Sequence, residues 1–73
     1  MKIKRVLIIP LCKIALELAQ QIEDYLEDDV EWIKSTDDVC IIFNANELQM
    51  YMIKGWLMHL QYEGHLPKPV KIY

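Results

Sequence analysis

Two uninterrupted apolar runs constrain the fold of this chain more than any other feature. One ends the segment Lys2–Ile9 (KIKRVLII), which Pro10 follows, and the other is Val39–Phe43 (VCIIF). Both runs are short and rich in β-branched residues, which predicts strands in the middle of a sheet. The segments Val30–Ser35 (VEWIKS) and Lys68–Tyr73 (KPVKIY) instead alternate apolar and polar residues, as half-buried edge strands do.

A first helix is predicted over Leu11–Glu27, where apolar residues recur at a helical period. They form one stripe that consists of Leu11, Ile14, Ala15, Leu18, Ile22 and Leu26. Such a stripe is typical of a helix that covers a sheet with one face and is solvated on the other.

A second helix is predicted to begin after Asn44 or Asn46, because either side chain can act as its N-cap. Glu47 follows Asn44 by three residues, which is the spacing of a capping box. The helix is expected to run to about Tyr62 and to end at Gly64, a residue typical of the position after a helix.

The predicted order of elements is β-α-β-β-α-β, the ferredoxin-like or split βαβ arrangement, with a turn at Thr36–Asp38. In that arrangement strands 1 and 3 occupy the middle of the sheet, which agrees with the two apolar runs. Right-handed crossovers then give an antiparallel sheet of order 4-1-3-2 with both helices on one face. We therefore predict one α+β domain over residues 1–73, with a small core of the kind that self-association often supplements.

The second predicted helix is more apolar than a single buried face requires. Ten of the sixteen residues from Glu47 to Tyr62 are apolar or aromatic. They fall on two arcs, the first being Met50, Ile53, Trp56, Leu57 and Leu60, and the second Leu48, Tyr51, Met52, Met58 and Tyr62, with Gly55 among the second. One arc is enough to cover a sheet, so the other needs its own explanation.

Two interpretations of the second arc are open from the sequence. Leu48 and Met52 could pack against the first helix. Alternatively, the arc contacts another molecule, since Tyr and Met are common in interface cores and a glycine permits close approach. The second interpretation makes Tyr51, Gly55, Met58 and Tyr62 a partner-binding surface; that list is our prediction for the helix.

The segment Glu23–Glu31 (EDYLEDDVE) carries six carboxylates in nine residues at the end of the first helix. The helix dipole disfavours anions there. The run could be compensated by cations that the topology brings near, which are Lys2, Lys4, Arg5 and Lys71, or it could attract a basic partner. In the second case Glu27, Asp28 and Asp29 are the predicted partner-binding acids. The run lacks the glycine of a calcium loop, so no metal site is expected.

Cysteine, histidine and aspartate residues are expected at the opposite end of the sheet, namely Cys12, Cys40, Asp37, Asp38, His59 and His65. They match no catalytic or zinc-binding spacing. The two cysteines are 28 positions apart and are interpreted as reduced core residues. We therefore expect no enzymatic activity, no cofactor and a cytoplasmic protein.

Nucleic-acid binding and membrane insertion are not expected either. The formal net charge is −3, whereas binding to phosphates needs a basic surface. RNA-recognition sheets expose aromatic residues on strands 1 and 3, and only Phe43 is available there. Trp32, Tyr73 and the lysines of the first and last strands could still form a modest basic edge. No apolar run approaches the roughly 18 residues that span a membrane.

The segment from Glu47 to Val70, a helix followed by GHLPKP, resembles the end of HicB-type antitoxins, in which a helix leads into a Gly-x-x-Pro-x-Pro turn. It covers a third of the chain. The Gly-rich strands and the Pro-Asp-Leu-Pro-Gly segment of that family are absent, so the chain is not assigned to it. The resemblance implies a small protein that neutralises another protein.

These features together predict a small non-enzymatic protein-binding module, of the kind that inhibits or regulates another protein stoichiometrically and self-associates as a homodimer. Accessory proteins of phages and mobile elements are one source of such modules. The alternative is a regulatory domain that binds nucleic acid or a small ligand on its open sheet face. That face would include Ile33, Cys40 and Ile42 or their neighbours one register away, because a shift of one residue exchanges the two faces.

Overall fold

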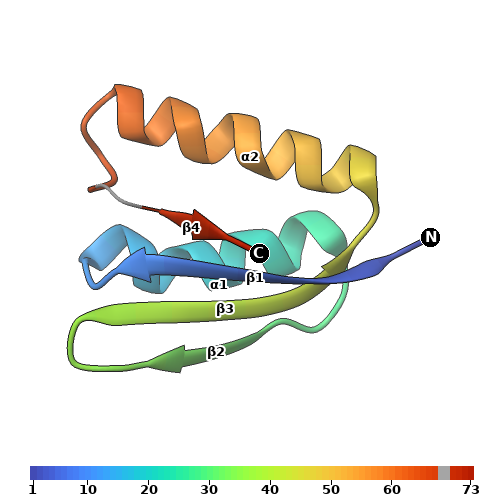
Figure 1. Ribbon diagram of the computed structural model, residues 1–73, viewed down its shortest axis with the longest axis horizontal. Coiled ribbons are helices and arrows are strands. Elements are labelled where there is room, and N and C mark those ends of the chain that lie inside the picture. Colours follow the sequence, from blue (N-terminus) through green and yellow to red (C-terminus); the bar gives the residue numbers. More distant parts are fainter. Residues whose placement is uncertain (68–69) are drawn as a thin grey trace.

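The computed structural model describes residues 1–67 and 70–73. Its elements are β1 (Ile3–Pro10), α1 (Lys13–Leu26), β2 (Glu31–Lys34), β3 (Asp38–Ala45), α2 (Glu47–Tyr62) and β4 (Lys71–Ile72) (Figure 1). The four strands form one antiparallel sheet in the order β2-β3-β1-β4. This is the predicted order 4-1-3-2 read from the other edge, so the α+β class and the strand order are confirmed.

One face of the sheet is buried under both helices. Leu7 and Ile9 of β1 point to this face, and so do the β3 residues that alternate from Val39 to Ala45. They form a single core with the buried residues of the helices, which are Ala15, Leu18, Ala19, Ile22, Leu26, Met50, Ile53 and Leu57. The unbroken apolar runs therefore belong to the two central strands, as predicted.

The other sheet face is open, and the strand register decides which residues lie there. Ile33 pairs with Cys40, and Cys40 pairs with Ile8 on its other side. Since paired residues point to the same face, Ile33, Cys40 and Ile42 all lie on the open face rather than in the core. Of the two registers that the sequence allowed, this is the one adopted.

Helix α1 has an unusual capping residue at each end. Cys12 is the N-cap, and its Sγ accepts a hydrogen bond from the Ala15 backbone N–H at 3.4 Å. At the other end Glu27 takes the left-handed conformation with φ 54°, and its N–H donates to the Glu23 carbonyl at 2.8 Å. The helix thus ends at Leu26, one residue before the predicted end.

Helix α2 has a complete capping box. The Asn46 side chain accepts from the Gln49 N–H at 2.7 Å, and the Gln49 side chain accepts from the Asn46 N–H at 3.0 Å. Asn44 still belongs to β3, where it pairs with Lys4, so the predicted pair of Asn44 and Glu47 is wrong. The helix ends before Gly64 as predicted, and Gly64 has φ 78°.

The observed bounds of β1, β2 and β3 differ from the predicted ones by one or two residues at each end. Pro10 lies inside β1, paired with Asp38, rather than after it. Backbone N–H groups alternate in direction along a strand, and that of Val6 points toward the β4 side, where it donates to the Tyr73 carbonyl. Pro10 therefore has its nitrogen on the β4 side, and its missing N–H removes nothing from the β1–β3 ladder. The last strand was predicted from Lys68, but residues 68–69 lie outside the described residues, and β4 covers Lys71–Ile72.

Candidate protein-interaction surface

The predicted second arc of α2 is exposed along the whole helix. Tyr62 is 92% exposed, Tyr51 74% and Leu48 71%, and Met52 and Met58 are also exposed. Figure 1 shows α2 along one outer edge of the molecule. One interpretation of the sequence packed Leu48 and Met52 against α1: it is wrong for Leu48, whereas Met52 is 54% exposed and lines a groove that α1 also borders. The assignment of this arc to a partner remains a prediction.

The exposed residues lie symmetrically about one glycine. Going outward from Gly55, Met52 and Met58 are three positions away on either side, and Leu48 and Tyr62 are seven positions away. At about 100° per residue, all of them fall within about 60° of the direction of Gly55. We call this surface the outer face of α2, and it consists of Leu48, Tyr51, Met52, Gly55, Met58 and Tyr62. It lies opposite the buried arc that contains Met50, Ile53 and Leu57.

Among the residues that the structure describes, none packs against the position of Gly55 in a way that requires a glycine. A Cβ atom added at this position would meet nothing within 4 Å. The backbone is ordinary α-helix, so no left-handed conformation requires a glycine. A glycine in the middle of an exposed helix costs about 1 kcal/mol relative to alanine. The described part of the chain therefore gives no structural reason for Gly55.

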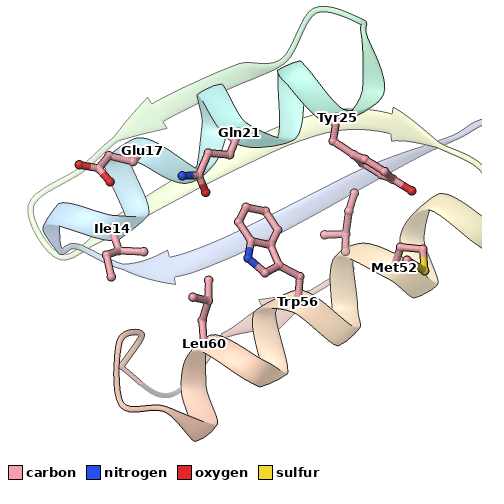
Figure 2. Close-up of a pocket in the computed structure, with 8 residues that line it drawn as sticks. Ile14, Glu17, Gln21, Tyr25, Met52, Trp56 and Leu60 are labelled. Carbon is pink, nitrogen blue, oxygen red and sulfur yellow. The ribbon is translucent and has the colours of Figure 1, made fainter.

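A groove separates α1 from α2, and sequence reasoning did not predict it. Its volume is about 640 Å³, and its lining is Ile14, Glu17, Gln21, Tyr25, Met52, Ile53, Trp56 and Leu60. Figure 2 shows the Trp56 ring between the two helices and Tyr25 reaching from α1 toward Met52. Trp56 and Leu60 were predicted as core residues, but they are only half-buried and pack at its margin. A clue in the sequence was Tyr25, a large aromatic residue outside the apolar stripe of the first helix.

The three predicted partner-binding acids lie together in the turn between α1 and β2. Glu27, Asp28 and Asp29 are all exposed. Among the predicted neighbouring cations, Lys2 reaches Asp28 at 3.7 Å between Nζ and Oδ2, whereas Arg5 donates from Nε to the Ala45 carbonyl at 3.4 Å. An exposed pair of this kind contributes only about 0–1 kcal/mol. Compensation within the fold is therefore partial.

The residues suggested for a basic edge do not come together. Tyr73 follows β4 at one edge of the sheet. Its backbone pairs with that of Val6, whose side chain belongs to the open face. Trp32 is on β2 at the other edge of the sheet, and it pairs with Ile41, which points toward the helices. Phe43 is 2% exposed and belongs to the core. The predicted grouping of Trp32 with Tyr73 is therefore wrong.

The reactive side chains were predicted at one end of the sheet, and the end of β1 does meet the β2–β3 turn there, since Pro10 pairs with Asp38 and the Leu11 N–H donates to the Asp37 carbonyl. Cys12 caps α1, and Cys40 is half-buried on the open sheet face, so its predicted place in the core is wrong. The His59 side chain contacts that of Glu63, the residue that follows α2. Over residues 1–67 and 70–73, no three His, Cys, Asp or Glu residues are arranged to hold a metal ion. In the same part of the chain, neither helix has the length and apolar character needed to cross a membrane.

Comparison of the chain with protein-family models, with curated proteins and with solved structures gives no match. The resemblance of its C-terminal third to HicB-type antitoxins therefore gains no support from these comparisons.

Proposed function

We propose that this protein is a small non-enzymatic protein-binding module with a ferredoxin-like fold, and that the outer face of α2 is its main contact surface. The observation that carries the proposal is the exposure of five large apolar side chains on one side of a helix whose other side is already buried. Contiguous exposed apolar patches are typical of protein contact sites. Tyrosine and methionine are also enriched in interface cores.

The role that suits such a module is stoichiometric binding, in which it inhibits or regulates another protein. A chain of 73 residues has a small surface, and large apolar side chains form a sizeable part of the surface of this protein. We propose a cytoplasmic accessory protein, of the kind found in phages and mobile elements. The exposed acids Glu27, Asp28 and Asp29 would then steer a positively charged partner toward the molecule.

Site-specific photo-cross-linking in the cells that make the protein tests the contact surface. A photoreactive phenylalanine analogue replaces Tyr51 on α2 or, as a matched control, Tyr73 beside the open sheet face; the two residues are 74% and 67% exposed. We expect protein adducts from position 51 and few from position 73. Adducts from position 73 alone would move the contact to the sheet face and contradict the proposal.

The acidic turn is tested by neutralising it. The triple variant Glu27→Gln, Asp28→Asn, Asp29→Asn should slow association with a partner recovered by cross-linking, and it should flatten the salt dependence of that rate. The dissociation rate should change little, since exposed charges act mainly during approach. An association rate that is unchanged at low salt would remove the acids from the binding surface.

A second candidate function is the binding of a small apolar ligand, and the groove between the helices favours it. Its volume of about 640 Å³ is in the usual range for ligand pockets, and Tyr25 and Trp56 contribute aromatic walls. Titration with apolar aromatic fragments should shift the NMR signal of the Trp56 indole N–H and leave that of Trp32 unchanged. Equal shifts at both residues would indicate non-specific adsorption instead.

A further inference from the structure

We infer that the molecule seated on the outer face of α2 is a second copy of this chain, whose own α2 lies antiparallel and crosses at Gly55. The inference rests on the proposed function: it names the molecule that covers this surface, and it leaves the exposed acids Glu27, Asp28 and Asp29 for the protein that the module regulates. It follows from the symmetry of the surface, from the glycine at its centre and from the area that it offers.

The first argument is symmetry. A two-fold axis through the midpoint of two antiparallel helices brings each residue level with its mirror position in the other copy. With the crossing at Gly55, Leu48 is level with Tyr62 of the second copy, and Met52 is level with Met58 of the second copy. Each of these pairings occurs twice, as an isologous interface requires. Leu48, Tyr51, Gly55, Met58 and Tyr62 also follow the three-four spacing of residues along a contact between two helices.

The second argument is the glycine itself. Gly55 lies in the middle of α2, at the centre of the outer face, and space around it is open within its own chain. The distance between packed helices depends on the side chains at the contact, so a glycine at the crossing point lets the backbones approach closely. A second copy supplies the same glycine at the same point. The pairing therefore gives Gly55 a structural reason, which the described residues of its own chain do not give.

The third argument is area. The five large side chains of the outer face are on average more than two-thirds exposed. With the roughly 200 Å² of an aromatic side chain taken for all five, the exposed area is at most on the order of 700 Å² per copy, just below the ~800 Å² per partner of a standard interface. Antiparallel α2 helices also oppose their dipoles, which is the favourable arrangement.

Engineered cysteines test the arrangement in the purified full chain. The background is Cys12→Ser, which keeps a side-chain cap on α1, together with Cys40→Ala. Gly55→Cys should oxidise to a disulfide-linked dimer, because facing Cα atoms at the crossing come within the ~7 Å that a disulfide spans. Lys54→Cys, exposed on the flank of the same helix, is the matched control and should remain unlinked.

The direction of the helices is read from a mixture. Leu48→Cys mixed with Tyr62→Cys, treated with a short thiol-to-thiol cross-linker, should give a dimer that contains one chain of each kind. Leu48→Cys alone should give none, since a self-link at position 48 requires parallel helices. Met58→Glu, added to Gly55→Cys, should abolish the disulfide dimer.

Two outcomes overturn the inference: neither the Gly55→Cys disulfide nor the mixed dimer of Leu48→Cys with Tyr62→Cys forms, or Leu48→Cys links to itself. The photo-cross-linking experiment at position 51 separates a failure of this inference from a failure of the proposed function. Adducts of about twice the 8.7 kDa chain mass support self-pairing. Adducts to a protein of different mass, without any to a second copy, refute self-pairing and leave the proposed function standing.

Discussion

At the residue scale, the two helix caps show how local chemistry positions the elements. Asn46 and Gln49 satisfy two backbone N–H groups reciprocally at the start of α2. Capping residues of this kind commonly contribute about 1 kcal/mol. The start of the helix that carries the outer face therefore depends on one side chain, and it was one of the two that the sequence suggested.

Asn46→Ala should lower the free energy of unfolding by about 1 kcal/mol, because it leaves the first turn of α2 without its acceptor. Urea unfolding followed by circular dichroism measures the change. Asn44→Ala is the matched control, since Asn44 is exposed on β3 and has no role in the cap. Equal losses in the two variants would contradict the cap.

Replacing Glu27 by glycine should raise the stability of the protein rather than lower it. A glutamate in the left-handed region carries a steric cost of roughly 1–2 kcal/mol that glycine avoids. Glu27→Gly should therefore raise the free energy of unfolding by about 1 kcal/mol, and Glu27→Gln, which removes only the charge, should raise it by less. A destabilised Glu27→Gly variant would show that the Glu27 side chain has a stabilising contact.

At the element scale, periodicity predicted both helices. It also predicted the two apolar arcs of α2, but not which parts of the molecule lie next to them. Two apolar arcs could be counted from the sequence, and the structure buries the one that contains Met50, Ile53 and Leu57. Which arc faces the sheet, and how closely α1 flanks α2, are tertiary properties. Neither the spacing of residues nor their hydrophobicity encodes them. For the same reason the groove beside Trp56 was not predictable.

Gly55→Leu should separate the stability of α2 from its association. The new side chain meets no atom within its own chain near the Cβ, and leucine is the better helix former, so the thermal midpoint of the single chain should rise. The same side chain lies at the proposed helix crossing, so the fraction of dimer should fall. Circular dichroism and sedimentation velocity measure the two effects. A variant that dimerises as well as the parent chain would place the crossing elsewhere.

At the scale of the whole molecule, the alternation of buried and open residues on the strands governs the core. Strand order was predictable because the unbroken apolar runs mark the central strands. The register was not predictable, because Val39–Phe43 is apolar on both sides and a shift of one residue would bury Cys40 and Ile42 instead. The open sheet face thus remains partly apolar.

Leu18→Ala tests this division between core and open face. Leu18 is fully buried, so the substitution should cost about 2–5 kcal/mol, a large part of the stability of so small a chain. Ile33→Ala removes a side chain of similar size from the exposed edge of the open face and should cost much less. Chemical unfolding of both variants measures the difference, and similar costs would contradict the observed register.

The central claim, that the outer face of α2 pairs with a second copy, is tested most directly by the molar mass in solution. Size-exclusion chromatography with light scattering should give twice the 8.7 kDa of one chain for the wild-type protein and a single chain mass for Met58→Glu. Ile33→Glu, an equivalent change on the open sheet face, should remain dimeric. A wild-type mass of one chain at every concentration, or a Met58→Glu variant as dimeric as the wild type, would contradict the account.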